Sequence, residues 1–358
     1  MKSKVYFLKA SLDEGEQNIS SKAVKLFHAG SFKNCFHEND FTAVKIHVGE
    51  AGNTTYIKAP CLQGLVYELL ALKTKPFLAD TSTLYACRRH NAIDHMMLAH
   101  EHGFDMHGLG IPFIILDGLF GTSETSVKID AILNKEVSIA ADIVRCQSIL
   151  SIAHFTGHIA ACLAATLKTL GMGCSSRKGK MRQHSALKPS VKDTCVRCGE
   201  CFKYCPADAI TIDDVKAHIN RDKCIGCAEC VAVCRFDAVE YDWGAENDIL
   251  QKNIAEHAKG VLKGKELKSV FFNFILSVAD ECDCMNTPNL RKIVPDIGIV
   301  ASTDPVAVDK AALDLVEKSG GGKLAELIKR KMLDPNPQLE HAERIGLGST
   351  TYNLIEVS

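Results

Sequence analysis

The chain has 358 residues, of which 46% are hydrophobic and 24% are charged, and its formal net charge is −1. This length allows two or three domains with a buried core, and the near-neutral charge gives no argument for binding nucleic acid or an acidic membrane surface. No apolar run reaches the roughly 18 residues of a membrane span, and the first residues lack the apolar core of a secretory signal. We therefore expect a cytoplasmic protein that does not cross a membrane.

Strands and helices alternate through the first half of the chain. Short apolar runs predict strands at residues 44–48, 77–81, 112–116 and 147–154, and longer periodic runs predict helices at 61–73 and 92–102. Such alternation is typical of a mainly parallel sheet with right-handed crossovers. Residues 1–187 are therefore expected to be the first part of an α/β domain.

Polar side chains follow several of these strands, where open parallel sheets bind their ligands. They are His47, Glu50, Asp80, Thr81, Thr83, His154 and His158. If a helix begins at His154, its ring and that of His158 share one face, because residues four apart are neighbours on a helix. Each side chain alone is more often a capping or core-polar residue than a ligand, but their shared location at strand ends favours a collective site.

The segment at residues 171–180 is glycine-rich, hydroxylated and basic. Its backbone N–H groups near Gly171 and Gly173, together with Arg177 and Lys180, would make a pocket for a phosphate or carboxylate. A flavin phosphate is one candidate, because a flavin converts one-electron into two-electron chemistry. The alternative is a helix end followed by a solvated basic loop. No dinucleotide fingerprint or Walker motif accompanies this segment.

Half of the 16 cysteines lie in two matching runs. The first run is Cys195-x-x-Cys198-x-x-Cys201-x-x-x-Cys205-Pro206, and the second is Cys224-x-x-Cys227-x-x-Cys230-x-x-x-Cys234. Three thiolates at this spacing can each reach a different iron of one cubane, and in two-cluster ferredoxins the last Cys of each run binds the other cluster. A zinc site would need only four ligands and would not require this pattern.

The spacing therefore predicts two [4Fe–4S] clusters with crossed ligand sets. Cluster 1 is assigned to Cys195, Cys198, Cys201 and Cys234. Cluster 2 is assigned to Cys224, Cys227, Cys230 and Cys205. Expected strands at 209–212 and 238–241 follow the two runs, which makes residues 188–242 an internally duplicated ferredoxin-like module. Arg235 replaces the proline that usually follows the last Cys, but this change removes no ligand.

The α/β pattern resumes after this module, in residues 243–358. A helix is expected at 246–262, strands at 269–276 and 297–302, and a further helix after Asp304-Pro305, with Asp as the N-cap and Pro at the first helical position. The ferredoxin-like module is thus expected to be an insertion in one α/β domain, entered at Lys188-Pro189-Ser190.

Cys282-Asp283-Cys284 places two thiols at the end of the strand expected at 269–276. The pair could bind a single metal with a nearby His, share a third cluster across a dimer, or act as a reactive dithiol, and two buried apolar thiols are the alternative. Isolated thiols are expected to pack in the core. They are Cys35, Cys61, Cys87, Cys146, Cys162 and Cys174.

Several stretches resemble the "domain of unknown function 362" family of iron–sulfur centre proteins. They are residues 45–50 with 52–56, residues 80–85, 154–158, 170–174 and 282–284, and residues 295–302 with 303–309. The resemblance extends over nearly the whole chain. Thr156 stands where similar sequences tend to have Lys, so an anion site that used that Lys is altered here. The resemblance implies an iron–sulfur protein without a proven reaction.

These observations predict an iron–sulfur electron-transfer protein, in which the clusters relay low-potential electrons between an external carrier and a redox or metal site in the α/β domain. The candidates at that site are Cys282, Cys284, His47, His154 and His158. The module carries 8 Lys and Arg against 10 Asp and Glu, which suits docking with a basic redox partner or a small electron carrier. The alternative is a redox-sensing or ligand-binding protein with regulatory or structural clusters. The sequence leaves a homo-oligomer open.

Overall fold

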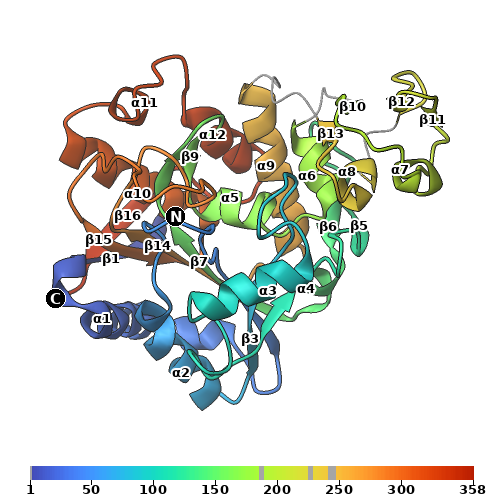
Figure 1. The fold of residues 1–358 in the computed structure, drawn as a ribbon. Coiled ribbons are helices and arrows are strands. Elements are labelled where there is room, and N and C mark those ends of the chain that lie inside the picture. The colour runs from blue at the N-terminus through green and yellow to red at the C-terminus, as the bar shows by residue number, and fades with distance from the viewer. Residues whose placement is uncertain (1, 185–188, 225–228, 241–246) are drawn as a thin grey trace.

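A computed structural model of the chain describes residues 2–184, 189–224, 229–240 and 247–358 (Figure 1). At its centre lies an eight-stranded sheet. Its strands are, in spatial order, β16 (Tyr352–Glu356), β1 (Ser3–Lys9), β15 (Gly298–Ser302), β14 (Ser269–Ile275), β7 (Ser148–His154), β2 (Phe41–Lys45), β3 (Lys75–Asp80) and β4 (Phe113–Ile115). Strands from before and after the cysteine-rich segment therefore share one sheet, while Lys188 and residue 242, the expected limits of that segment, lie outside the described residues.

The five strands from β14 to β4 are mutually parallel, and β15 runs antiparallel to both β14 and β1. The prediction of a mainly parallel α/β fold is therefore confirmed. Strand β2 lies earlier in the chain than the strand expected at residues 44–48. Its ladder with β3 runs from Phe41 to Lys45 and ends before Val48. Since neighbouring strands point the same way, the carboxyl ends of β14, β7, β2 and β3 meet at one edge of the sheet.

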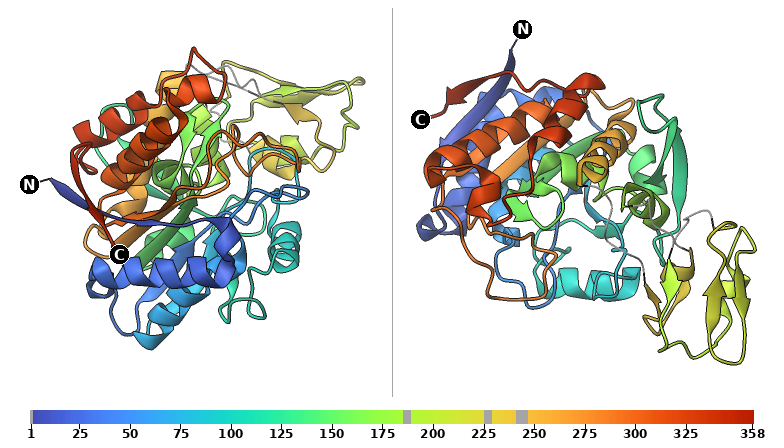
Figure 2. Two further views of the ribbon diagram at one scale, coloured as in Figure 1. Left: turned by 90° about the vertical axis from the view of Figure 1, so that its left-hand side faces the viewer. Right: turned by 90° about the horizontal axis from the view of Figure 1, so that it is seen from above.

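Helices cover both faces of the sheet (Figure 2). One apolar core is closed by α1 (Glu16–Ala29), α2 (Gln63–Ala71) and α3 (Ala92–Glu101). The other is closed by α5 (Thr166–Gly171), α9 (Asn247–Leu262), α10 (Pro305–Gly320) and α12 (Asn336–Arg344). The shorter elements are η1 (Leu12–Glu14), η2 (Phe32–Cys35), η3 (Ala59–Leu62), β5 (Glu124–Lys128), β6 (Glu136–Ala140), α4 (Ala141–Arg145), β8 (Thr156–His158), β9 (Cys162–Ala164), α6 (Arg177–His184) and α11 (Leu324–Leu327).

Two aspartates, the half-buried Asp304 and the buried Asp309, fix the starts of helices. Asp304 caps α10 as predicted, and its carboxylate accepts from the N–H groups of Val306 and Ala307, both at 2.9 Å. Asp309, on α10, accepts from the N–H groups of Thr166 and Leu167 at the start of α5, both at 2.8 Å. These bonds satisfy N–H groups that a helix cannot satisfy itself, and they hold α5 beside the end of β7.

The cysteine-rich segment forms two small antiparallel sheets and two short helices. Its elements are β10 (Ser190–Val191), α7 (Glu200–Lys203), β11 (Ile210–Ile212), β12 (Ala217–Ile219), α8 (Glu229–Val233) and β13 (Val239–Glu240). Strand β10 pairs with β13, and β11 pairs with β12. In the right-hand view of Figure 2 the segment extends away from the large sheet, with β11 and β12 outermost. Within the described ranges, no helix combines the length and apolarity of a membrane span.

Candidate active site

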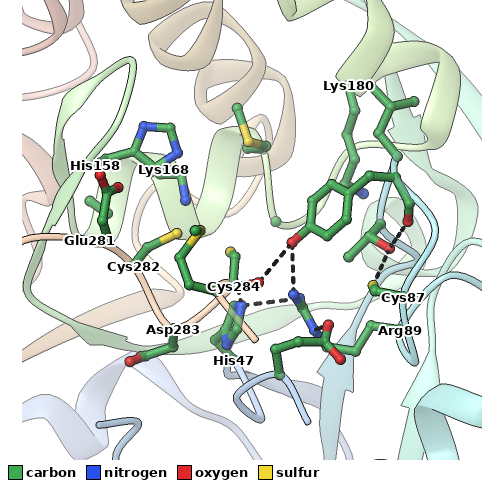
Figure 3. Close-up of a pocket in the computed structure, with 18 of the residues that line it drawn as sticks. His47, Cys87, Arg89, His158, Lys168, Lys180, Glu281, Cys282, Asp283 and Cys284 are labelled. Carbon is green, nitrogen blue, oxygen red and sulfur yellow. Dashed lines mark hydrogen bonds and ion pairs between the residues drawn. The ribbon is translucent and has the colours of Figure 1, made fainter. Parts of the chain in front are cut away.

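A cavity of about 920 Å³ lies at the edge of the sheet where the parallel strands end. Its size is within the range of small-molecule sites. The structure brings all of the strand-end residues singled out from the sequence to its wall, and Figure 3 labels His47 and His158 among them. They are His47, Glu50, Asp80, Thr81, Thr83, His154 and His158, joined by Cys282 and Cys284. This collection follows from the parallel pairing, since each residue lies at the end of a strand or in the segment that follows one.

The helix considered for residues 154–158 does not form. His154 is the last residue of β7, and His158 ends β8, a short strand that pairs with β9. The Nδ1 atom of His158 accepts from the N–H groups of Ala160 and Ala161, at 3.2 and 2.9 Å. These bonds close a tight turn in place of a helix, and burial lowers the pKa of His158 well below its usual value.

Asp283 anchors the turn that carries Cys282 and Cys284. Its carboxylate contacts His154 Nδ1 at 2.7 Å and accepts from the Thr55 hydroxyl at 2.8 Å. The other ring nitrogen of His154 lies 2.6 Å from the Leu276 carbonyl. Both ring nitrogens therefore face acceptors, which requires an imidazolium. Burial alone would lower the pKa of His154, but the Asp283 carboxylate raises it above its usual value, and His154 in turn lowers that of Asp283.

The two thiols beside Asp283 differ in exposure and in charge. Cys282 is buried, whereas Cys284 is half-buried. The hydrogen bond from Cys282 and the charge of Lys168 hold the pKa of Cys284 well below its usual value. The same hydrogen bond and burial raise the pKa of Cys282. These shifts favour the proton on Cys282 and the negative charge on Cys284, and Lys168 lies on the same side of the cavity (Figure 3).

His47 supports the thiolate from the opposite side. Its Nδ1 accepts from the Gly49 N–H at 3.0 Å, so Nε2 carries the ring proton and faces Cys284 Sγ at 3.3 Å. Arg89 Nη1 approaches the same Nε2 at 3.0 Å. A protonated Nε2 cannot accept this third contact, so a neutral imidazole N–H and the Arg89 guanidinium converge beside the sulfur of Cys284.

Arg89 and Cys87 are site residues that the sequence does not reveal. Arg89 is buried and donates to Glu50 at 2.9 Å and to the Tyr85 hydroxyl at 2.9 Å. Cys87 contacts Thr83 Oγ1 at 3.1 Å and lines the cavity, so its expected role as a core thiol is wrong. No spacing or alternation marks either residue, because both lie in an irregular loop between β3 and α3. By contrast, four isolated thiols are buried as expected, namely Cys61, Cys146, Cys162 and Cys174.

The four residues expected to form an anion pocket do not come together. Gly173 and Lys180 line the cavity, but Gly171 packs so closely on α9 that a Cβ would lie 2.0 Å from the Ile254 carbonyl. Arg177 is buried and donates to the carbonyls of Thr83 and His90. The solvated basic loop considered as the alternative is also wrong, since residues 177–184 form the buried helix α6.

Lys180 is the buried cation that this segment contributes to the cavity. Its Nζ donates to Thr81 Oγ1 at 2.7 Å and to the Ser175 carbonyl at 2.6 Å, and it forms no ion pair with a described carboxylate. Burial lowers the pKa of Lys180 to about 8. Lys45 is different, because it pairs with Asp80 at 2.8 Å. Lys180 and Lys168 therefore supply positive charge that an anionic ligand could neutralise.

In the cysteine-rich segment, four thiols surround a second, small cavity. They are Cys195, Cys198, Cys201 and Cys234. Burial and the neighbouring thiol groups of Cys195, Cys198 and Cys234 raise the pKa of Cys201. Backbone N–H groups point at the sulfur atoms in equivalent places of the two halves, from Ala209 to Cys205 and from Ala238 to Cys234, both at 3.3 Å.

The other expected set is described in part. Cys224 and Cys205 are half-buried, Cys230 is buried, and Cys227 lies outside the described residues. No disulfide joins any of the described thiols. In the part of the chain that the structure describes, no three His, Cys, Asp or Glu side chains are placed to hold one metal ion. In a cubane each thiolate binds a different iron, so the absence of such a group from the described residues does not test the two cluster sites. It does give no support to a single metal ion at Cys282 and Cys284.

The segment packs directly against the wall of the large cavity. Leu84, which lines that cavity, belongs to the same apolar cluster as Cys230, Val231 and Met181. Helix α8 contacts α6, whereas α7 contacts α8 and β11. Helix α8, which carries Cys230, therefore lies between α6 of the α/β domain and α7, which carries Cys201.

The fold and the two groups of thiols define an α/β protein with a thiol-bearing cavity at its strand ends and an adjoining cysteine-rich segment. The chain belongs to the family described as "Domain of unknown function (DUF362)", whose model matches residues 42–314. No curated protein matches the chain. The family description supplies no reaction.

Two solved structures are similar to the chain at low sequence identity. The first is described as the lactate racemase apoprotein from Thermoanaerobacterium thermosaccharolyticum, with 13% identity over 74% of this chain and 57% of that chain, and a TM-score of 0.36. The second is a protein from Thermotoga maritima, with 11% identity over 93% of this chain and 61% of that chain, and a TM-score of 0.41. The chain thus spans less than two thirds of the length of each.

Proposed function

We propose that the protein is an iron–sulfur electron-transfer protein, in which two [4Fe–4S] clusters connect an external carrier with the thiol-bearing cavity. The observation that carries this proposal is the grouping of Cys195, Cys198 and Cys201 with Cys234 around one small cavity. Cys234 is remote from the other three in sequence. Their grouping is the crossed ligand set that the spacing predicts for a two-cluster ferredoxin.

The donor set fits this cofactor. Free thiols supply the ligands, and N–H groups directed at Cys205 and Cys234 would stabilise the negative charge of a thiolate. The pairing of β10 with β13 and of β11 with β12 brings the two halves of residues 188–242 together, which supports a ferredoxin-like module. Cys224, Cys227, Cys230 and Cys205 would hold the second cluster. When bound, the clusters would supply one-electron transfer at low potential.

The packing suggests a direction for the electrons. The module contacts the cavity wall through Cys230 and Leu84, so the second cluster would be the inner one. At the outer end, Cys198 is exposed and lies near the exposed side chains of Val196 and Phe236. A redox partner protein or a small electron carrier would therefore approach the first cluster.

A second function is favoured by the small core of the module. Among the described residues, its apolar cluster has eight buried members, including Leu84 and Met181 from the α/β domain. Domains with such small cores usually need metals or cross-links to fold, so the clusters could brace a redox-sensing or ligand-binding protein.

Anaerobic reduction separates these two functions. The protein, purified without oxygen, is titrated with a low-potential one-electron donor, and its visible absorbance and EPR spectrum are recorded. Electron transfer predicts bleaching and the EPR signals of two interacting reduced clusters. Clusters that stay oxidised under this donor would contradict the proposal and support the bracing role. Flavin and other metals are quantified in the same sample, because a bound chromophore would identify a different acceptor in the cavity.

A further inference from the structure

We infer that Cys284 is a nucleophile for small anionic disulfides and that Cys282 is its resolving thiol, so that the cavity reduces such disulfides. This inference deepens the proposed function, because it identifies the acceptor that the electrons reach. It rests first on the position of the two sulfur atoms. A hydrogen bond from the Met285 N–H to the Cys282 carbonyl, at 3.1 Å, closes a turn over 282–285. The turn brings the two Cα atoms within the span of a disulfide.

The difference between the two thiols assigns their order. Cys284 is the more accessible one and is held as a thiolate, whereas Cys282 is 8% exposed and keeps the shared proton. An attacking thiol must be accessible and ionised, and a resolving thiol needs only to reach the sulfur of the first. The Asp283–His154 ion pair holds the turn in place, since the side chain between the two thiols is fixed on both sides.

The surroundings define the substrate class. Lys168 and Lys180 both line the cavity and form no ion pair with a described carboxylate, so a ligand with carboxylates would neutralise them. A second thiol beside the nucleophile can release a bound group only when attack on Cys284 Sγ breaks the bond to that group, as it does in a mixed disulfide. Disulfides meet this condition, whereas carbon electrophiles do not.

The reaction balances without a further reactant. The Cys284 thiolate attacks one sulfur of the disulfide, forms a mixed disulfide and releases the first thiolate, which takes up a proton. Cys282 then loses its proton and attacks Cys284 Sγ, which releases the second thiol and leaves a Cys282–Cys284 disulfide. The substrate gains two electrons and the pair is oxidised. Under the proposed function, two electrons from a low-potential one-electron donor, with one proton, restore the Cys284 thiolate and the Cys282 thiol.

Glutathione disulfide is a suitable probe in a single-turnover experiment with the full-length protein. The protein is reduced with dithiothreitol, freed of reductant without oxygen, mixed with the probe, quenched with an alkylating agent and mapped by mass spectrometry. The wild type should form the Cys282–Cys284 disulfide and release two glutathiones. Cys282→Ser should accumulate the mixed disulfide on Cys284, and Cys284→Ser should do neither. Cys35→Ser, a half-buried thiol of η2, should behave like the wild type.

The charge of Lys168 gives a second readout. Other charged or titratable groups around the thiol pair are His47, Tyr85, Arg89, His158, Glu281 and Asp283. Lys168→Met should slow alkylation of Cys284 near pH 7 by about tenfold or more, because one pKa unit changes the thiolate fraction tenfold. It should also shift the pH profile upward, and Lys168→Arg should restore both. An unchanged profile would overturn the role of Lys168.

The two proposals can fail separately. If no glutathione adduct forms on Cys284, or if adducts are equally frequent on other thiols, the disulfide site is overturned even if the clusters accept electrons. Single turnover does not depend on the clusters. If it succeeds but the one-electron donor cannot sustain repeated turnover, the electron-transfer function is contradicted and the thiol site remains.

Discussion

The double variant Cys195→Ser/Cys234→Ser is expected to keep one intact [4Fe–4S] cluster, with about four irons per chain. The variant Cys195→Ser/Cys205→Ser is expected to keep neither. In the crossed assignment, Cys195 and Cys234 hold the same cluster, so their joint loss leaves the other ligand set complete. Cys205 belongs to the second set, so its loss together with Cys195 damages both. Iron and acid-labile sulfide, measured after anaerobic purification, distinguish the two outcomes.

The opposite pattern would show that each run holds its own cluster. In that case Cys195→Ser/Cys205→Ser would keep about four irons and Cys195→Ser/Cys234→Ser would keep none. Cys35→Ser serves as the matched control, since this thiol lies outside both runs and should leave the iron content unchanged. Circular dichroism of each variant checks that the α/β domain, which supplies most of the secondary structure, is retained.

His154→Gln is expected to lower the free energy of unfolding by about 3–5 kcal/mol, because it leaves the buried Asp283 carboxylate without its cation. The matched control is the exposed pair of His100 and Asp105 on the protein surface. His100→Gln should cost less than about 1 kcal/mol, as is usual for surface ion pairs. Urea denaturation of the wild type, His154→Gln and His100→Gln at pH 6 measures the loss of unfolding free energy in each variant. Equal costs would contradict the role of His154 as a buried cation.

The pH dependence of this difference follows from the two pKa shifts. His154 has a raised pKa, so its contribution is fully present below about pH 6.5 and is lost as the pH rises through its folded value. Asp283 has a lowered pKa, so its contribution is present above about pH 4 and is lost as the pH falls through its folded value. The cost of His154→Gln should therefore be largest between these limits and shrink on both sides.

Much of the fold can be predicted from local patterns. The apolar runs that become β3, β7 and β14 are buried on both faces, as central parallel strands are, so composition alone marks them. The Asp304-Pro305 signal places the start of α10 correctly. Helix α6 is different, because its basic residues suggest a solvated segment. Its burial depends on tertiary partners, such as the carbonyls that receive the Arg177 guanidinium.

The site can be predicted where it follows strand ends and not elsewhere. His47, His154 and the Cys282–Cys284 pair lie at strand ends or in the segments that follow them, so the parallel order brings them together. Lys168 comes from helix α5, and its direction depends on the Asp309 contacts that fix the start of that helix. Arg89 enters from a loop without a periodic pattern. Lys168 and Arg89 are recognisable as site residues only in the structure, where their positive charges face the same cavity.

The central claim is that residues 188–242 bind two iron cubanes. Its most direct test is the iron and acid-labile sulfide content of the full-length protein, expressed and purified without oxygen. We expect about eight irons and about eight sulfides per chain, in a brown protein. A colourless protein with fewer than about four irons per chain would contradict the account.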